Sequence, residues 1–310
     1  MGYIDMHCDT LLRHYCDKTT NLLEDKIHHV SLQKLKEGGA LLQCFAHFDP
    51  KERFHYDFDN LLAFLDYSHA LIKDNEETVR LVTNMKELDK ERINTLFTLE
   101  DGGSIHADHD KLEALYQRDV RMIALTWNFE NCFGFPNSQD PVAMAKGLKP
   151  FGFAAVEQMN ALGMLVDVSH LSDGGFWDVA ETTKAPFVAS HSNCRAIKSH
   201  PRNLTDEMIR AVADSGGVIG VNFLCDFLSD EPVSCISAIL RHMRHLQKVG
   251  GADVVALGGD YDGISCELEL SDASKMPLLW DAMAEAGFAP SEIEKIMWKN
   301  TYRVMEDVLR

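Results

Sequence analysis

Residues 164–170 read Met-Leu-Val-Asp-Val-Ser-His, and residues 187–191 read Phe-Val-Ala-Ser-His. Each stretch is short, apolar and rich in small or β-branched residues, and each ends in a histidine. Nearly continuous apolar runs of this length are typical of strands that are buried on both faces of a parallel sheet. The two stretches therefore predict two buried parallel strands, each with a histidine at its carboxyl end.

Similar apolar runs recur along the whole chain and alternate with helical patterns. The predicted strands are 2–8, 40–48, 95–99, 121–127, 164–169, 187–190, 218–224 and 254–258. The predicted helices include 60–74, 205–216 with Thr205 as N-cap, 234–248 and 290–309. This alternation predicts an α/β protein built as a (β/α)8 (TIM) barrel, with a doubly wound open sheet as the alternative. We expect residues 1–310 to form a single domain, because no linker-like or low-complexity tract interrupts them.

Charge and composition narrow the classes of partner. The chain has 30 basic and 48 acidic residues, a net charge of −18 and no basic cluster, which argues against nucleic acid as a partner. It has no signal-peptide pattern and no apolar run long enough to span a membrane, so we expect a cytoplasmic protein with no membrane partner. Its eight cysteines lack a C-x-x-C pair and fit reduced thiols. A homodimer stays open, although no interface patch can be named.

Side chains of the types that bind metals follow the carboxyl ends of the predicted strands. They are His7, Asp9, Glu100, His170, His191, Asp260 and Asp262. His7 and Asp9 are two residues apart, so in an extended strand they share a face while Cys8 points to the other. In a barrel all of these strand ends meet at one rim, where active sites are built. Imidazole and carboxylate groups are typical zinc ligands, so the pattern predicts a metal site at this rim.

The other histidines are assigned by their surroundings in the sequence. Helical or loop contexts predict solvated side chains for His14, His28, His29, His55, His69, His242 and His245. His47 lies near a strand end and His106 lies in the loop after Glu100, so both are candidates for lining the pocket, whereas His200 is interpreted as a turn residue. The long loop 129–148 follows a predicted strand, and we expect it to line or cover the active site.

Taken together and in this order, the strand-end motifs resemble the membrane dipeptidase (renal dipeptidase) family of M19-type zinc metallopeptidases, in a soluble microbial form. The motifs are Asp-Met-His-Cys-Asp-Thr-Leu (5–11), Thr-Leu-Glu-Asp-Gly (98–102), Val-Asp-Val-Ser-His-Leu-Ser (166–172), Ala-Ser-His-Ser-Asn (189–193), His-Pro-Arg-Asn-Leu-Thr-Asp (200–206) and Gly-Gly-Asp-Tyr-Asp-Gly (258–263). The resemblance covers essentially the whole chain. It implies a metal-dependent hydrolase barrel of the amidohydrolase type that cleaves free dipeptides, with D-residues accepted at the second position.

The resemblance also implies roles for individual residues. It implies two Zn²⁺ ions per chain, one held by His7 and Asp9 and the other by His170 and His191, with Glu100 bridging the two. A hydroxide between such ions would attack the peptide bond.

Other residues would handle the substrate. The resemblance implies that Asp260 is the catalytic acid/base and that Arg202 holds the terminal carboxylate of the substrate. Trp127, Asn128 and Asp262 are further candidates for substrate binding.

Two positions depart from the family pattern. In well-known mammalian members a histidine that polarises the scissile carbonyl occupies the position of Trp127, and a tyrosine occupies the position of Leu224. The chain therefore keeps the metal-binding motifs while its pocket differs. One alternative is another binuclear amidohydrolase that acts on a cyclic amide, lactone or phosphoester. A non-catalytic descendant is the other alternative, and the retained metal-binding residues and Asp260 argue against it.

Overall fold

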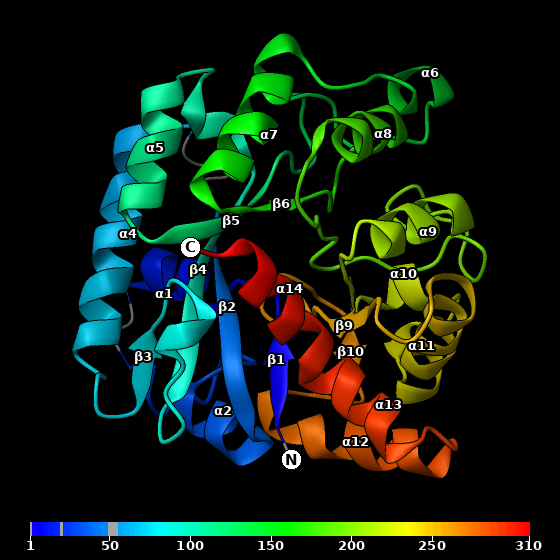
Figure 1. Cartoon of the computed structure of the whole chain (residues 1–310). Coiled ribbons are helices and arrows are strands. Elements are labelled where there is room, and N and C mark those ends of the chain that lie inside the picture. Colours follow the sequence, from blue (N-terminus) through cyan, green and yellow to red (C-terminus); the bar gives the residue numbers. More distant parts are fainter. Residues whose placement is uncertain (1, 19–20, 49–54) are drawn as a thin grey trace.

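The computed structural model describes residues 2–18, 21–48 and 55–310, and its centre is a curled sheet of parallel strands (Figure 1). Seven strands pair in the order β6-β5-β4-β2-β1-β9-β7. They are β1 (Tyr3–Asp5), β2 (Ala40–Phe48), β4 (Ile93–Glu100), β5 (Val120–Ala124), β6 (Leu165–Asp167), β7 (Ile219–Val221) and β9 (Val255–Leu257). Each of them coincides with one of the predicted apolar runs.

Residues 187–190 complete the barrel between β6 and β7. Asp167 of β6 pairs in parallel with Val188, and Ala189 pairs in parallel with Ile219 of β7. Since β9 also pairs in parallel with β1, the eight segments follow one another around the barrel in chain order. This closure confirms the predicted (β/α)8 barrel and rules out the doubly wound open sheet, whose edge strands would stay unpaired.

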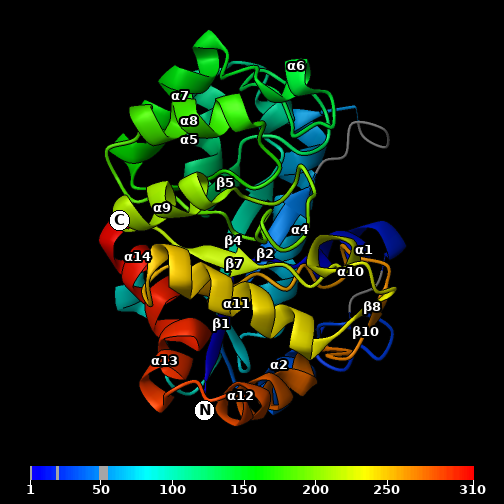
Figure 2. The ribbon, with the colours of Figure 1, turned by 90° about the vertical axis from the view of Figure 1, so that its right-hand side faces the viewer.

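Helices surround the barrel, as two views at right angles show (Figures 1 and 2). They are α1 (Thr10–Asp17), α2 (Leu32–Gly38), α4 (Phe58–Lys73), α5 (His109–Gln117), α6 (Pro141–Met144), α7 (Pro150–Leu162), α8 (Asp173–Thr182), α9 (Asp206–Asp214), α10 (Cys225–Leu228), α11 (Ile236–Gly250), α12 (Met276–Glu285), α13 (Pro290–Glu294) and α14 (Asn300–Val308). The predicted helices correspond to α4, α9 and α11, and the predicted 290–309 is divided by a π-helical turn, η4 (Lys295–Lys299). Thr205 caps α9 as predicted, because its side chain accepts a hydrogen bond from the backbone N–H of Met208.

Short elements add to this plan. The strand β3 (Val79–Leu81) pairs with the amino end of β4, and β8 (Val233–Ser234) pairs with β10 (Glu267–Leu268) outside the barrel. Single turns of 3-10 helix occur at η1 (Met85–Glu87), η2 (Gly102–Ile105) and η3 (Ala273–Lys275). In the part of the chain that the structure describes, no helix is both long and apolar enough to cross a membrane.

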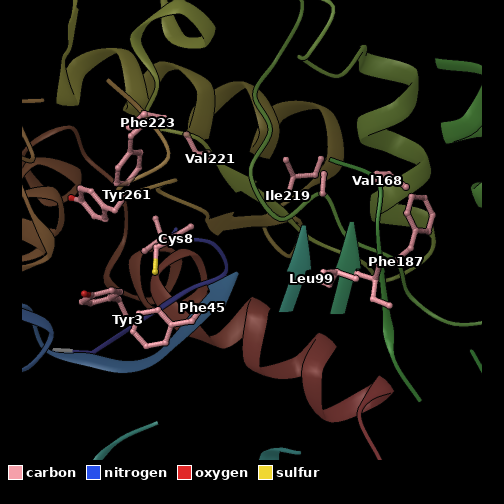
Figure 3. Packing of buried hydrophobic residues seen from close by; sticks show 14 of the residues in the cluster. Tyr3, Cys8, Phe45, Leu99, Val168, Phe187, Ile219, Val221, Phe223 and Tyr261 are labelled. Atoms are coloured by element: carbon pink, nitrogen blue, oxygen red, sulfur yellow. The ribbon is translucent and has the colours of Figure 1, made fainter. Parts of the chain in front are cut away.

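The apolar core has two layers that leave the carboxyl ends of the strands to polar residues. Inside the barrel, residues such as Ile4, Leu42 and Leu96 form a cluster that Val304 and Met305 of α14 close at the amino end. A larger cluster, part of which Figure 3 shows, fills the space between strands and helices. Because apolar side chains fill the amino-terminal part of the barrel and cover its outside, buried polar groups gather at the mouth formed by the carboxyl ends of the strands.

Candidate metal centre and substrate pocket

A group of largely buried histidine and carboxylate side chains meets at the carboxyl ends of the barrel strands. Its members are His7, Asp9, Glu100, His170, His191 and Asp260. Glu100 is the last residue of β4, and the others follow their strands or strand-like segments within a few residues. The structure therefore brings together all the side chains that were predicted to bind metal, along with Asp260.

Glu100 presents its two carboxylate oxygens to different partners. Its Oε1 lies 3.0 Å from Nε2 of His170 and 3.5 Å from Nε2 of His191, while its Oε2 lies 3.7 Å from Nε2 of His7. The Nε2 atoms of His170 and His191 are themselves 3.0 Å apart. One carboxylate thus stands between the nitrogens of His170 and His191 on one side and that of His7 on the other, which is the arrangement that a bridging ligand requires.

The second set of donors is centred on His7. Its Nε2 lies 3.8 Å from Oδ2 of Asp9 and 3.8 Å from Oδ1 of Asp260. The neighbouring Gly263 makes this convergence possible, because a Cβ atom there would lie 2.1 Å from Asp9 Oδ2 and 2.3 Å from Asp260 Oδ1. As predicted, Cys8 points the other way, into the outer apolar layer. Asp260 therefore lies beside one set of the atoms that were predicted to bind metal.

The charges of this group favour a bound cation. Burial lowers the pKa of His7, but the carboxylates of Glu100, Asp9 and Asp260 outweigh it and raise that pKa to about 10. Burial and the nearby carboxylate of Asp9 raise the pKa of Glu100 well above its usual value. Nε2 of His7 and Oδ1 of Asp9 are buried without a hydrogen-bond partner among the described residues. Buried nitrogen and oxygen atoms that lack hydrogen-bond partners and lie beside clustered carboxylates are suited to bind metal ions.

The opposite histidines are suited to bind metal in their neutral form. Burial, together with the positive charges of Arg202 and His7, lowers the pKa of His170 well below its usual value. Burial and the charge of His7 have the same effect on the pKa of His191. A neutral imidazole offers a nitrogen lone pair, which a metal ion needs.

A hydroxyl and a carboxylate hold His191 from behind. Its Nδ1 lies 2.7 Å from Oγ of Ser190, and this hydroxyl donates to Oδ2 of Asp167. The peptide of Ser190 is packed tightly, since a Cβ atom on Gly220 or Gly258 would lie 2.0 or 1.8 Å from its carbonyl oxygen. The Nδ1–H of His191 thus donates to Ser190, which leaves Nε2 free to face Glu100.

Replacing Ser190 with alanine is expected to weaken metal binding by about 10–100-fold, because His191 loses the partner that orients its ring. Titration of the metal-free variant with Zn²⁺, compared with the parent, measures this change. Ser215→Ala is the control, since that hydroxyl bonds to the carbonyl of Val212 at the end of α9. Equal affinity of Ser190→Ala and the parent would contradict the role given to Ser190.

His170 is held by the segments that follow β5. Its Nδ1 lies 3.3 Å from Oδ1 of Asn128, and its carbonyl oxygen accepts a 2.7 Å hydrogen bond from the backbone N–H of Asn137. Asn137 belongs to the loop 129–148 and lines the pocket described below, as predicted for this loop. Asn128, predicted as a substrate residue, lines the same pocket and also supports a histidine.

Asn222 holds Asp260 in place. The side-chain Nδ2 of Asn222 donates a 2.8 Å hydrogen bond to Oδ2 of Asp260. The side-chain amide of Asn193 in turn donates to the backbone carbonyl oxygen of Asn222 and accepts from its backbone N–H. Burial, together with the carboxylate of Asp9, raises the pKa of Asp260 to about 6 against the opposing effects of His7 and Asn222. Oδ2 of Asp260 is thereby occupied, and Oδ1 faces His7.

Arg202 is a buried cation beside these groups. Its Nη1 donates to Oγ of Ser192 at 2.8 Å and its Nη2 to the carbonyl oxygen of His191 at 2.9 Å. Burial lowers the pKa of Arg202 to about 10. Its Nε has no hydrogen-bond partner among the described residues. The guanidinium is therefore held in one orientation with donor capacity left over, as a carboxylate-binding site needs.

A cavity of about 510 Å³ opens above the side chains that were predicted to bind metal. All four predicted substrate residues, Arg202, Trp127, Asn128 and Asp262, line it. Its apolar walls are formed by Leu12, Phe48, Trp127, Leu224, Phe227 and Ile264. Trp127 packs its ring 4.8 Å from that of Phe48 and 6.3 Å from that of His170. Both positions that depart from the family pattern thus lie in the pocket, as expected.

Asp262 differs from the other lining residues because protein groups occupy its carboxylate. Its Oδ2 accepts a 2.5 Å hydrogen bond from the hydroxyl of Thr10, and its Oδ1 accepts a 2.7 Å bond from the backbone N–H of His29. The backbone N–H of Val30 also approaches Oδ2, at 3.4 Å. Asp262 thereby joins α1 to residues 29–30 at the edge of the pocket.

Three histidines that were predicted to be solvated are buried, so that prediction was wrong for them. They are His14, His28 and His242. His242 lies on α11 and bonds to the backbone of Cys194 and Leu228. Among the candidates for lining the pocket, His47 packs between Phe64 and Phe97 instead. His106 bonds to the carbonyl oxygen of Tyr56 and is exposed.

Several polar residues of this region were not predicted as part of the site. Asn222 directly follows β7, so the strand-end rule that selected the metal-binding residues also points to it. His200 lines the pocket and accepts a hydrogen bond from the backbone N–H of Arg202, in addition to its place in a turn. Arg13 on α1 lines the pocket with no signal in the sequence.

Comparison with known proteins gives consistent matches. A family model described as membrane dipeptidase (peptidase family M19) matches residues 1–310. An uncharacterized protein in the pqqA 5' region of Klebsiella pneumoniae is 40% identical over 223 residues, which are 68% of this chain and 80% of that protein.

Solved structures agree over the full length. The structure of dipeptidase AC, a metallopeptidase of family M19, has a TM-score of 0.92 at 26% identity and covers 100% of this chain and 99% of its own. A metallopeptidase from Rhodobacter sphaeroides, liganded with a phosphinate mimic of the dipeptide L-Ala-D-Ala, has a TM-score of 0.90 at 25% identity and covers 99% of both chains.

Proposed function

Since this chain belongs to the membrane dipeptidase family (peptidase family M19), we propose that it holds two zinc ions and uses them to hydrolyse the peptide bond of free dipeptides. Hydrolysis by a metal-dependent peptidase is the activity of the family. The identity and number of the ions, the residues that hold them and the preferred dipeptide are what the proposal adds.

The position of Glu100 carries the proposal of two ions. Its oxygens face two separate donor sets, at 3.0 and 3.5 Å on one side and 3.7 Å on the other. We assign His7 and Asp9 to one ion, His170 and His191 to the second, and Glu100 to both. Nitrogen and carboxylate ligands in this number suit zinc with a coordination position left open for catalysis.

The chemistry divides between the ions and the protein. When bound, two zinc ions supply activated water near neutral pH and polarise the peptide carbonyl. Oδ1 of Asp260 accepts the proton of the attacking water, and the resulting carboxyl donates that proton to the nitrogen of the departing amine. Asn222 binds Oδ2 of Asp260 and so directs Oδ1 to this transfer.

Arg202 selects short peptides with a free end. Its guanidinium is buried, fixed by Ser192 and the backbone of His191, and lines the pocket. We assign it to the terminal carboxylate of the dipeptide, which it binds by charge-assisted hydrogen bonds. The Rhodobacter sphaeroides relative is liganded with a mimic of L-Ala-D-Ala, which supports a D-residue at the second position.

Replacing Arg202 with alanine is expected to raise KM for free dipeptides by about 10–100-fold, because a charge-assisted hydrogen bond contributes about 1.5–3 kcal/mol. Steady-state kinetics with a dipeptide and its C-terminal amide test this. The parent should discriminate strongly against the amide, and Arg202→Ala should not. Arg210→Ala, an exposed change on α9, is the control. If the parent binds the free acid and the amide equally well, the role of Arg202 is wrong.

Metal analysis combined with a substrate panel tests the proposed function as a whole. Chelator-treated protein should lose the release of amino acids from dipeptides, and added Zn²⁺ should restore it. The panel should contain dipeptides with L- and D-residues at the second position, a cyclic amide, a lactone and a phosphoester. Turnover of one of the last three alone would favour a different binuclear hydrolase, and no turnover of any compound by the zinc-loaded chain would favour a non-catalytic descendant.

A further inference from the structure

A second group of metal-binding side chains lies outside the pocket, between α1 and residues 21–31. It consists of His14, Asp25 and His28. Nε2 of His14 lies 2.9 Å and Nδ1 of His28 lies 2.5 Å from the same oxygen, Oδ2 of Asp25. The side chains are 0%, 7% and 8% exposed for His14, Asp25 and His28, so water reaches them little.

The donor set and its spacing resemble those around Glu100. In both places two imidazole nitrogens face one carboxylate oxygen, at 3.0 and 3.5 Å in the pocket. Zinc lies about 2.0–2.2 Å from nitrogen and oxygen ligands, which places neighbouring ligands of a tetrahedral ion roughly 3.3 Å apart. The contacts of Asp25 therefore need to open by less than about 1 Å to admit an ion.

The groups around this cluster orient its members as outer partners of a metal site do. Nε2 of His28, the ring nitrogen that does not face Asp25, lies 3.6 Å from Oδ2 of Asp17. The other oxygen of Asp25, Oδ1, accepts hydrogen bonds from the backbone N–H groups of Ile27 and His28. The ammonium group of Lys34 donates to the carbonyl oxygen of His28. A carboxylate beside the second nitrogen of a ligand histidine is a common feature of zinc sites.

We propose that His14, Asp25 and His28 bind a third zinc ion, separate from the pair assigned to the pocket. Nε2 of His14, Oδ2 of Asp25 and Nδ1 of His28 are its protein ligands, and a water molecule completes the tetrahedron. With only three protein ligands, this ion binds more weakly than a closed four-ligand site would.

The position of the cluster gives this ion a structural role. It joins α1, which carries His14, to residues 21–31, which carry the other two ligands. The same two segments hold Asp262, through the hydroxyl of Thr10 and the backbone N–H of His29. The ion thus fastens the support of the turn that contains Asp260, two residues before Asp262.

Counting bound zinc tests the proposal without relying on catalysis. Metal-free protein is dialysed against buffers of fixed, saturating free Zn²⁺ and analysed for zinc per chain. We expect three ions for the parent, two for His28→Gln and two for Asp25→Asn. The double variant His7→Asn/His191→Asn, which lacks ligands of both proposed catalytic ions, should retain one. His69→Gln, a half-buried histidine on α4 outside both clusters, is the control and should retain three.

Thermal unfolding provides a second readout that separates this proposal from the proposed function. In the His7→Asn/His191→Asn background, Zn²⁺ at about 100 times its Kd should raise Tm by on the order of 5 °C. Adding His28→Gln or Asp25→Asn to that background should abolish the shift. Equal zinc content of the parent and both cluster variants at saturation overturns the proposal, however many ions the pocket holds. So does a double variant whose Tm does not respond to Zn²⁺, because the cluster is then an ion-paired His–Asp–His group without metal.

Discussion

Glu100→Gln is expected to lose dipeptide hydrolysis on the order of 10⁴-fold in kcat/KM and at least one bound zinc ion. The substitution keeps the size of the side chain but turns one carboxylate oxygen into an amide NH₂ group. That group would face either the His170–His191 side or the His7 side. On each side the parent protein has a carboxylate oxygen, which can bind a metal ion, whereas an amide NH₂ group cannot. The negative charge of the carboxylate is lost as well. Zinc content and dipeptide turnover of the purified variant measure both effects.

A carboxylate far from the pocket provides the control. Glu113 is an exposed residue of α5, and Glu113→Gln should match the parent in zinc content and turnover. Circular dichroism of Glu100→Gln should show that the barrel is intact, since β4 pairs with both neighbours through its backbone. Parent-like activity of Glu100→Gln would remove this residue from the metal centre and would leave the proposed pair of ions without its bridge.

Asp260→Asn is expected to reduce kcat by about 10²–10⁴-fold while KM changes little. An amide cannot accept the proton of water and deliver it to the leaving amine. Because Nδ2 of Asn222 donates to the position of Oδ2, the new amide turns its oxygen to Asn222 and its NH₂ group toward His7. The ligands assigned to the two ions remain, so the variant should bind both.

Asp262→Asn is the comparison for this change. Its carboxylate accepts hydrogen bonds from Thr10 and the backbone of His29. Its substitution should therefore lower Tm and leave kcat close to that of the parent. Zinc analysis of both variants separates a chemical from a metal-binding effect. If Asp260→Asn turns over dipeptides at the parent rate with both ions bound, Asp260 is not the acid/base of the reaction.

Much of the barrel was predictable because its strands are buried on both faces. Each strand needs a nearly continuous apolar run, and such a run is visible without an alignment. The same reasoning located the site, because polar residues directly after such runs lie at one mouth of a closed barrel. The segment 187–190 shows how well apolar runs predict strands. Only isolated β-bridges join this segment to its neighbours, and its apolar run still identified it as a strand of the barrel.

Burial on helices and in loops was harder to predict. His14 and His242 lie on helices and His28 lies in a loop, and their burial depends on which faces other elements cover. The carboxylate of Asp262 follows the same strand as that of Asp260, yet it supports the chain while Asp260 faces His7. Strand-end position assigns a residue to the rim but does not say which of its neighbours will occupy its polar atoms.

The sequence by itself determined which side chains gather at the mouth of the barrel, because the apolar runs and the positions where they end are local properties of the chain. Only the tertiary structure decided which partners the polar atoms of those side chains face. It placed the two oxygens of Glu100 on different donor sets, put Ser190 behind His191, and brought His14 of α1 to Asp25 and His28. Except for Ser190 and His191, these contacts join residues far apart in the chain, and all of their distances depend on packing that no local pattern encodes.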